Sequence, residues 1–279
     1  SLKNTFYQAI SFNADLSKWN VSKVITLETT FQDADAFNSD LSTWDVSKAI
    51  TLKSTFNRAN VFNSDLSKWE VSNVVTMSYT FANARVFNAD IGKWHVSKVK
   101  DMEGMFSNAH VFNRDLSQWH VSKVEDFSYM FYHSDQFNSD LSTWVVVSAT
   151  TIGYMFTNAR NFNSDLSKWK VSKLIVSEEL SMNGMSNAFV DASLFKGSHL
   201  FCNHSEWDTI PLKLSDFRGS ATETSIWCGR PDELRNINIQ SAVDDWIGAS
   251  IAAEGSEKTL LLLLEHLPSI EDWDTSRIT

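Results

Sequence analysis

The chain has 279 residues, of which 43% are hydrophobic, and it carries a formal net charge of −10. This hydrophobic content is sufficient for a folded core and excludes wholesale disorder, and a count of only two cysteines excludes a miniprotein held together by disulfides. The longest apolar run, residues 260–264, is far shorter than the roughly 20 residues that a membrane-spanning helix needs.

Tryptophan is unusually abundant, and its spacing explains why. Seven of the 11 tryptophans follow one another at intervals of 25 residues without an insertion, and two phenylalanine series, one Asn and one Asp keep the same interval. The aromatic series are Trp19, Trp44, Trp69, Trp94, Trp119, Trp144 and Trp169, then Phe6 to Phe156, and Phe12 to Phe162. A fixed period of 20–50 residues is typical of a solenoid, a propeller or an array of repeats.

Each repeat is expected to contain one short strand and one short helix. Trp19 and Val21 are two residues apart, which places both side chains on one face of a strand. Met102 and Met105 belong to a helically spaced apolar set, and Asp101 is a suitable N-cap for that helix. A repeat of 25 residues is too short for a propeller blade and lies in the leucine-rich-repeat range. Stacked coils then bury the aromatic side chains against one another.

The consensus F-N-x-D-L-S-x-W-x-V-S-x-V, present at residues 12–24, resembles the BspA-type repeat of 25–26 residues. That repeat occurs in bacterial surface proteins and lipoproteins, and in algal and protist proteins. The resemblance covers residues 1–175, which form seven regular repeats. It implies an α/β repeat solenoid, a leucine-rich-repeat-like right-handed coil with one short parallel strand and one short helix per repeat. It also implies a surface or adhesion role without catalytic residues.

The regular rhythm ends near residue 175. Residues 176–230 are interpreted as irregular terminal coils, in which Met182, Met185 and Ala188 echo the spacing of Met102, Met105 and Ala109. These three residues therefore mark the expected helical slot of a degenerate repeat.

Beyond this region the sequence predicts a boundary between two arrays. Cys202 and Cys228 are separated by close to one coil length, so they are candidates for a disulfide, with two buried thiols as the alternative. Residues 231–279 are interpreted as a helical linker and the start of a second repeat array, because the residues around Trp273 match the strand slots of the first array. We therefore expect the sequence to be a piece of a longer protein.

The side chains beside the tryptophan are the candidate binding surface. If Trp19 and Val21 point inward, their neighbours point outward, and stacking arranges those neighbours in ladders. The variable middle ladder is Asn20, Asp45, Glu70, His95, His120, Val145 and Lys170, the first ladder includes Lys18, Lys68, Lys93 and Lys168, and a further lysine series is Lys23, Lys48, Lys98, Lys123 and Lys173. We expect a partner-specific face on the sheet; the alternative is a solvated polar face without a partner.

The sequence does not indicate catalysis, metal binding or nucleic-acid binding. The sequence has no nucleophile-elbow, phosphate-loop, dinucleotide or zinc motif. His95 and His120 occupy adjacent coils, but no third metal ligand is evident, and the Asn and Asp columns are interpreted as caps for loop amides rather than as calcium ligands. Residues 1–175 hold 17 basic and 17 acidic residues, whereas residues 176–279 hold 7 and 17, so nucleic-acid binding by a basic surface is not expected.

The sequence thus predicts a non-enzymatic repeat scaffold that mediates protein–protein interaction or adhesion through its sheet face. No cofactor, no metal and no transmembrane segment are expected, and the compartment is expected to be the cell surface or the secreted space. The alternative is a structural or accessory subunit of a large assembly, such as a surface layer, a flagellar or virion coat, or an organellar membrane complex such as a photosynthetic supercomplex. In that alternative, aromatic loop residues such as Tyr129, Tyr132 and Tyr154 serve packing within the assembly. A third interpretation is adsorption of ice or glycan on a flat repetitive face; ice binding favours regular Thr ladders, and the mixed Lys, Asp and His columns argue against it.

Overall fold

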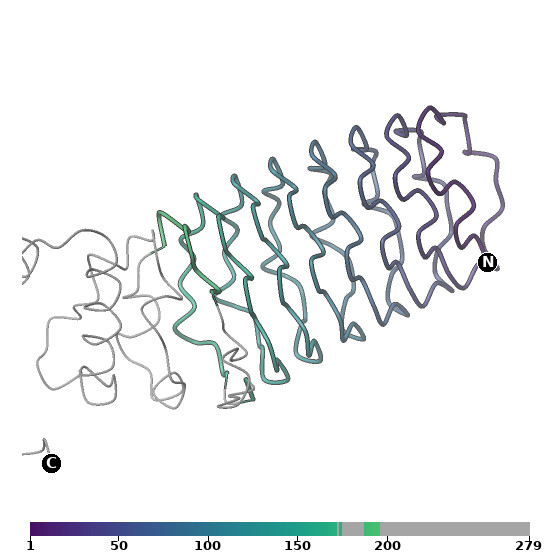
Figure 1. Ribbon diagram of the computed structural model, residues 1–279. Coiled ribbons are helices and arrows are strands. Elements are labelled where there is room, and N and C mark those ends of the chain that lie inside the picture. Colours follow the sequence, from purple (N-terminus) through teal and green to yellow (C-terminus); the bar gives the residue numbers. More distant parts are fainter. Residues whose placement is uncertain (172, 175–186, 196–279) are drawn as a thin grey trace, which may run out of the picture.

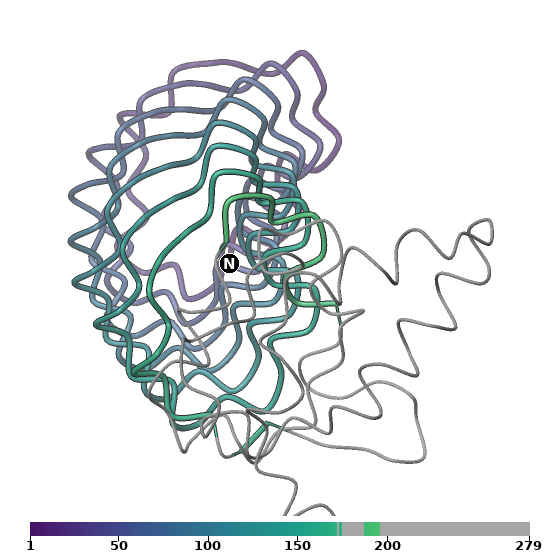
Figure 2. The same cartoon turned by 90° about the vertical axis from the view of Figure 1, so that its left-hand side faces the viewer.

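A computed structural model of the chain describes residues 1–171, 173, 174 and 187–195 (Figure 1). In these residues the backbone winds into coils that follow one another along a rod, and the view along the rod shows the coils as nested outlines (Figure 2). Each coil takes one sequence repeat, so coil 1 is 1–25, coil 2 is 26–50, and coil 7 begins at 151. Isolated parallel bridges join successive coils at Thr26, Thr51, Thr76, Asp101, Asp126 and Thr151.

The described residues contain no α-helix and no extended strand; turns and single bridges make up every coil. We call the segment from 27 to 37 in coil 2, and its equivalent in each other coil, the arc. The sequence predicts a helix here, but in coil 3 the N–H groups of Ser54 and Phe56 donate to Ser78 and Thr80 of the next coil, at 2.9 Å in each case. The intervening Thr55 donates back to Leu52 at 3.0 Å.

This alternation excludes a helix, because in a helix every interior N–H bonds the carbonyl four residues before it. Two residues per arc also have positive φ, for example Ser54 at 52° and Arg58 at 58°. Left-handed residues at an interval of four interrupt helical geometry in every coil. The arc is therefore a zigzag of turns whose alternate amides bond the neighbouring coil.

The predicted strand at Trp19–Val21 is also replaced by turns. The N–H of Trp19 donates to the carbonyl of Leu16 at 3.0 Å, and Val24 donates to Val21 at 2.8 Å. Parallel pairing between coils occurs instead at the position of Thr26, which the sequence suggested as a helix N-cap. The expected inward and outward directions hold in coils 2–7, since Trp44 and Val46 are buried and Asp45 between them is exposed. In coil 1, Val21 is buried but Trp19 is 42% exposed. The assignment to the leucine-rich-repeat class stays a prediction.

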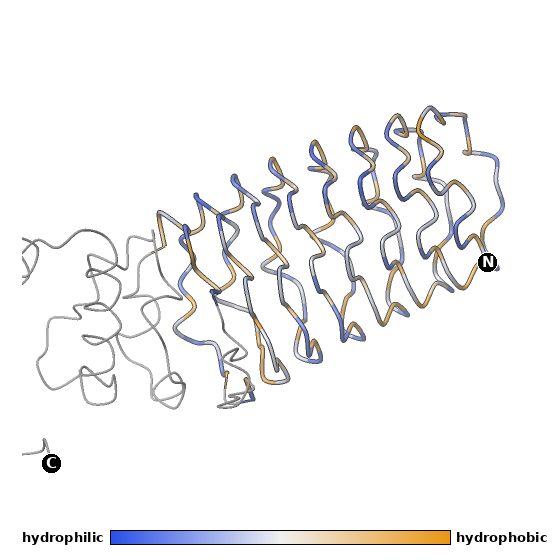
Figure 3. Ribbon diagram, viewed as in Figure 1, coloured by the Kyte–Doolittle hydropathy of each residue, from blue (hydrophilic) through white to orange (hydrophobic). Residues whose placement is uncertain are grey.

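Hydrophobic and hydrophilic residues alternate along each coil (Figure 3), and the hydrophobic ones fill the space inside it. Phe56, Phe81 and Phe106 are fully buried and stack with ring centroids 5.6 and 5.8 Å apart. Within one coil, Phe81 also stacks on Phe87 at 3.8 Å. The prediction that the aromatic columns form the core is confirmed.

Polar groups of the coil are satisfied by three repeated hydrogen bonds. The indole N–H of Trp94 donates to the carbonyl of Leu66 in the preceding coil at 3.0 Å, and the same bond recurs from Trp44 to Trp169. The Asn63 Oδ1 accepts from the backbone N–H of Asn88 at 2.7 Å, and this bond also recurs along the stack. Each Asp of the repeated column caps the turn two residues later. The predicted capping role of both columns is confirmed.

An eighth arc follows the seven regular coils after a longer stretch of sequence. Phe189 stacks on Phe156 with ring centroids 5.4 Å apart, and Phe195 stacks on Phe162 at 5.6 Å. In both pairs the two partners are further apart in the sequence than one regular repeat. The amide of Phe156 donates to the carbonyl of Ala188 at 2.8 Å, as in the contacts between regular coils.

The predicted register in this region is therefore wrong. Ala188 matches Met155, and Ala192 rather than Ala188 takes the place of Ala159, because additional residues lie before the arc. The remaining part of the 176–230 interpretation, the Cys202–Cys228 pair and the 231–279 linker lie outside the described residues.

Candidate functional site

We call the outward residues on either side of the buried tryptophan column, together with the lysine series that follows it, the ladder face. All ten predicted residues of this face are exposed to solvent, while the tryptophans of coils 2–7 between them are at most 3% exposed. The ten residues are Lys18, Asn20, Asp45, Lys68, Glu70, Lys93, His95, His120, Lys168 and Lys170. The structure thus brings them onto one side of the coil stack, as successive rungs.

Two ladder residues have a structural task that the sequence analysis missed. The Asn20 Oδ1 accepts from the amide of Ser22 at 3.2 Å and from its hydroxyl at 2.7 Å, and the Asp45 Oδ1 accepts from the amide of Ser47 at 3.1 Å. Hydrogen bonds from the Ser47 hydroxyl and amide lower the pKa of the Asp45 carboxyl. These residues cap the turn that follows the tryptophan, so their substitution affects the local backbone as well as the surface.

The central ladder residues are not tied to their surroundings. Within the described part of the chain, Glu70, His95 and His120 take part in no hydrogen bond and no ion pair. In the lysine series, Lys98 donates to the Asn73 side chain at 2.7 Å, which links coils 4 and 3. The charge and shape of the three central residues are thus set by sequence alone and not by packing.

The first ladder is partly compensated by the neighbouring aspartate column. Lys18 lies near Asp15, and Lys68 lies near Asp65, and in both cases the lysine contributes to a lowered pKa of the carboxyl, after the larger effect of hydrogen bonds from a serine. The described residues include no group of three or more His, Cys, Asp or Glu placed to hold a metal ion. They also include no helix long and apolar enough to cross a membrane.

A second outward surface lies on the arcs, and it includes the tyrosines that the sequence analysis assigned to packing within a large assembly. Four of the five tyrosines of the chain occur on the arcs of coils 4, 6 and 7. Tyr129 and Tyr154 stack in parallel with centroids 4.8 Å apart, and Tyr132 meets Tyr129 edge-on at 5.7 Å. Burial, with a smaller effect of Tyr154, raises the pKa of the Tyr129 hydroxyl. The signal for this surface is the concentration of four of the five tyrosines in coils 4–7.

The Tyr79 side chain reaches this surface by lying across Gly104 of the next coil. An added Cβ on Gly104 would lie only 2.5 Å from the Tyr79 ring, so the ring occupies the space of the missing side chain. The Tyr79 hydroxyl donates to Glu103. Burial first, and this hydrogen bond second, raise the pKa of Tyr79 well above its usual value.

The far end of the arc carries a polar edge in coils 5–7. His110 Nδ1 lies 2.9 Å from an Asp135 carboxylate oxygen, and Arg160 lies 3.7 Å from the other one. His133 contacts the Asn158 amide at 3.2 Å, and burial lowers the pKa of the His133 imidazole. These contacts link adjacent coils along the edge.

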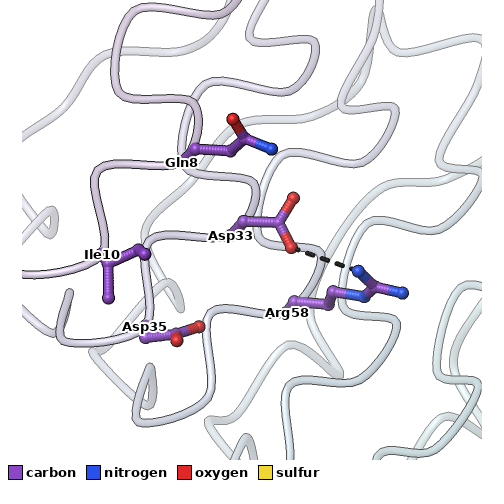
Figure 4. A pocket seen from close by; sticks show the side chains of 5 residues that line it. All are labelled: Gln8, Ile10, Asp33, Asp35 and Arg58. Carbon is purple, nitrogen blue, oxygen red and sulfur yellow. Dashed lines mark ion pairs between the residues drawn. The ribbon is translucent and has the colours of Figure 1, made fainter.

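The same edge in coils 1–3 forms a shallow open depression lined by Gln8, Ile10, Asp33, Asp35 and Arg58 (Figure 4). Arg58 pairs with Asp33 at 3.6 Å, and Asp35 accepts from the Asn60 amide at 2.9 Å. Both carboxylates thus have partners within the array.

Comparison with known sequences adds one finding. The sequence profile of the family described as "Mycoplasma protein of unknown function, DUF285" matches residues 1–94 and 75–198. The two matches overlap and together include the seven regular coils and the eighth arc. None of the curated proteins with which the chain was compared matches it significantly.

Proposed function

The chain belongs to the DUF285 family of repeat proteins, and we propose that it is a non-enzymatic scaffold that binds a protein partner through its ladder face. One observation carries the proposal. The ladder side chains are exposed, differ from coil to coil and are largely free of internal contacts, although the backbone beneath them is held by the same bonds in every coil.

A fixed backbone favours this use. Association costs less when the backbone of the binding surface is already ordered, because only side chains lose freedom. Seven rungs at about 4.8 Å give a face roughly 29 Å long, which is adequate for a specific interface of about 800 Å² per partner. The middle ladder runs from Asp45 and Glu70, through two histidines, to Lys170. A partner with the complementary order of charges fits it in one direction only.

We infer further that the chain has no catalytic activity. Catalytic groups are normally placed in concave sites that shift their pKa values, whereas the ladder residues lie on an open, exposed row. The resemblance of the repeat to BspA-type surface proteins favours the cell surface or the secreted space as the compartment. It also favours adhesion as the biological setting of the interaction.

The alternative, a structural subunit of a large assembly, predicts contacts on several faces instead of one. Site-specific photo-crosslinking in the native host separates the two. The photoreactive residue is placed on the ladder by His95→benzoylphenylalanine and, as a matched control, on the exposed far edge of the arc by Arg85→benzoylphenylalanine.

A crosslink to one protein from position 95, without a crosslink from position 85, is the expected result. Crosslinks from both positions to several neighbours favour the assembly subunit. If position 85 gives a crosslink and position 95 gives none, the result is incompatible with binding through the ladder face.

A further inference from the structure

We propose that the arcs of coils 4–7 form a second binding surface, one that takes a protein segment presenting arginine or lysine side chains. We call it the tyrosine surface. Its residues are Tyr79, Tyr129, Tyr132 and Tyr154 with the carboxylates of Asp101, Glu103 and Asp126. It lies outside the ladder face and stands whether or not the ladder face binds a partner.

The aromatic part of the surface is preorganised. Tyr129 is 37% exposed and is held between Tyr154, on which it stacks, and Tyr132, which meets it edge-on. In the described residues, the hydroxyls of Tyr129, Tyr132 and Tyr154 make no hydrogen bond to the protein. Tyrosine supplies a large, rigid contact area with a polar tip, and it is enriched at binding hot spots.

The charges at the starts of the arcs of coils 5 and 6 have a single sign, whereas Arg85 and Arg160 lie at the far end of the arcs. Asp101 directly precedes the arc of coil 5, Glu103 lies in its first turn, and Asp126 directly precedes the arc of coil 6. None of the three carboxylates is within ion-pair distance of a described Lys, Arg or His. Their hydrogen bonds come from neutral groups, as from Thr76 to Asp101 at 3.0 Å. The negative charge of the surface is therefore not cancelled inside the array.

The same columns in coils 1–3 have the opposite character. Lys3 and Lys53 occupy the column of Glu103 there, and the acidic Glu28 of the same column pairs with Lys3 at 2.9 Å. Tyr7 is the single tyrosine of those arcs. Aromatic faces and uncancelled carboxylates therefore coincide only in coils 4–7.

This combination fits a cation. Guanidinium and ammonium groups are attracted to the faces of aromatic rings and to carboxylates at once. Arg suits the surface better than Lys because its planar group stacks on rings and bonds carboxylates through two N–H groups. A neutral glycan is the other ligand class that stacks on tyrosine, but it makes no use of the three uncancelled charges.

The test measures binding of a fluorescent peptide with alternating arginine and glycine, at physiological salt, to the full chain. The control peptide has citrulline in place of arginine, which keeps the shape and removes the charge. Tyr129→Ser installs the residue that coil 3 has at the equivalent Ser54, and Glu103→Gln removes one charge while it keeps an acceptor for Tyr79. The matched control variants are Tyr7→Ser and Glu28→Gln, which change the same residue types on the arcs of coils 1 and 2.

We expect Tyr129→Ser and Glu103→Gln each to weaken arginine-peptide binding about five- to tenfold, and the two controls to stay within twofold of the unmodified chain. Equal losses in test and control variants would reduce the binding to non-specific attraction by an acidic protein and overturn the proposal. Equal binding of the citrulline peptide, or Tyr129-dependent binding of a neutral hexasaccharide without peptide binding, would overturn it as well. The citrulline comparison needs no variant, so the result does not depend on how well a variant folds.

Discussion

The inward and outward columns of this array follow different rules. Inward positions repeat almost unchanged, and each is fixed by contacts to the coils before and after it, such as the Phe56–Phe81–Phe106 stack and the bond from Trp94 to Leu66. Outward positions vary, and Glu70 and His95 make no hydrogen bond and no ion pair with the part of the chain that the structure describes. The difference shows that stability and surface identity are carried by separate residues of one repeat unit.

The largest expected effect is in the core. Phe81→Ala removes ring contacts to Phe87, Phe106 and Trp94 at a fully buried position, so we expect a loss of about 3–5 kcal/mol in the free energy of unfolding. Phe6→Ala makes the same change at a partly buried end position and should cost less than half as much. Denaturant unfolding of both variants measures the ratio. Equal losses in the two variants would contradict the conclusion that a ring buried inside the stack contributes more to the free energy of unfolding than a ring at its end.

Substitution of Gly104 in coil 5 is expected to have an intermediate effect on the free energy of unfolding. Gly104→Ala places a Cβ into the Tyr79 ring, and we expect a cost of about 1–3 kcal/mol in the free energy of unfolding. The positive φ of 56° contributes a strain that Ser54 and Tyr129 also carry in their coils, and the clash with the Tyr79 ring adds to it. Adding Tyr79→Ser should therefore recover the part of the loss that the clash causes. A double variant whose loss is the sum of the two single losses would contradict this steric explanation.

Substitution of the repeated asparagine is expected to have a smaller effect on the free energy of unfolding. Asn88→Ala leaves the Asn113 amide without its acceptor at 3.0 Å, for an expected loss of about 1 kcal/mol. Lys93→Ala, five residues later on the ladder face, has no such bond and should change the free energy of unfolding by less than about 0.5 kcal/mol. Thermal unfolding of the two variants compares the loss of the inter-coil hydrogen bond of Asn88 with the loss of the exposed Lys93 side chain. A comparable loss in both would contradict the division.

A pH series tests the aspartate caps. Hydrogen bonds from the amide and hydroxyl of the following serine lower the pKa of Asp40, Asp65 and Asp140 below the value of 3.8 for a free side chain. A carboxyl whose pKa is depressed by folding stabilises the fold above the unfolded pKa, and that stabilisation is lost as the pH falls through the folded pKa. The denaturation midpoint should thus fall below about pH 3.8.

The variant with Asp40→Asn, Asp65→Asn and Asp140→Asn should show a shallower fall over the same pH range, since three of the titrating caps are gone. An equally steep fall in this variant would show that other carboxyls govern the acid response.

The repeat period carried most of what the sequence could tell. A strict, uninterrupted period determines which side chains meet in adjacent coils, so the Phe and Trp stacks and the Asn and Asp caps could be derived without a structure. The backbone of the arc could not, because inward side chains of a turn zigzag have the same spacing as one face of a short helix. What distinguishes them is that alternate amides, such as those of Ser54 and Phe56, bond the next coil and not their own.

Two further features were not predicted from the sequence, each for a different reason. The motif F-x-x-A-x-x-F recurs at residues 189–195, but a search bound to the regular period passes over a repeat that is displaced by an insertion. Three residues of the tyrosine surface were identified as aromatic loop residues, but their stacking on one another depends on the turn geometry of the arcs, which the sequence did not predict. The ladder face was located correctly as an exposed row, whereas the capping roles of Asn20 and Asp45 depend on turns that replaced the expected strand.

The central claim is that the ladder residues without a capping role, such as Glu70, His95 and Lys170, bind a partner without supporting the fold. The most direct measurement combines partner capture from the native host with thermal unfolding for one variant that reverses ladder charges, Glu70→Lys with His95→Glu and Lys170→Glu. Arg85→Glu, at an exposed position on the arc edge, is the control. We predict an unfolding free energy within about 0.5 kcal/mol of the unmodified chain per substitution, together with loss of the partner that the control variant retains. Unchanged capture by the folded, charge-reversed protein would contradict the account.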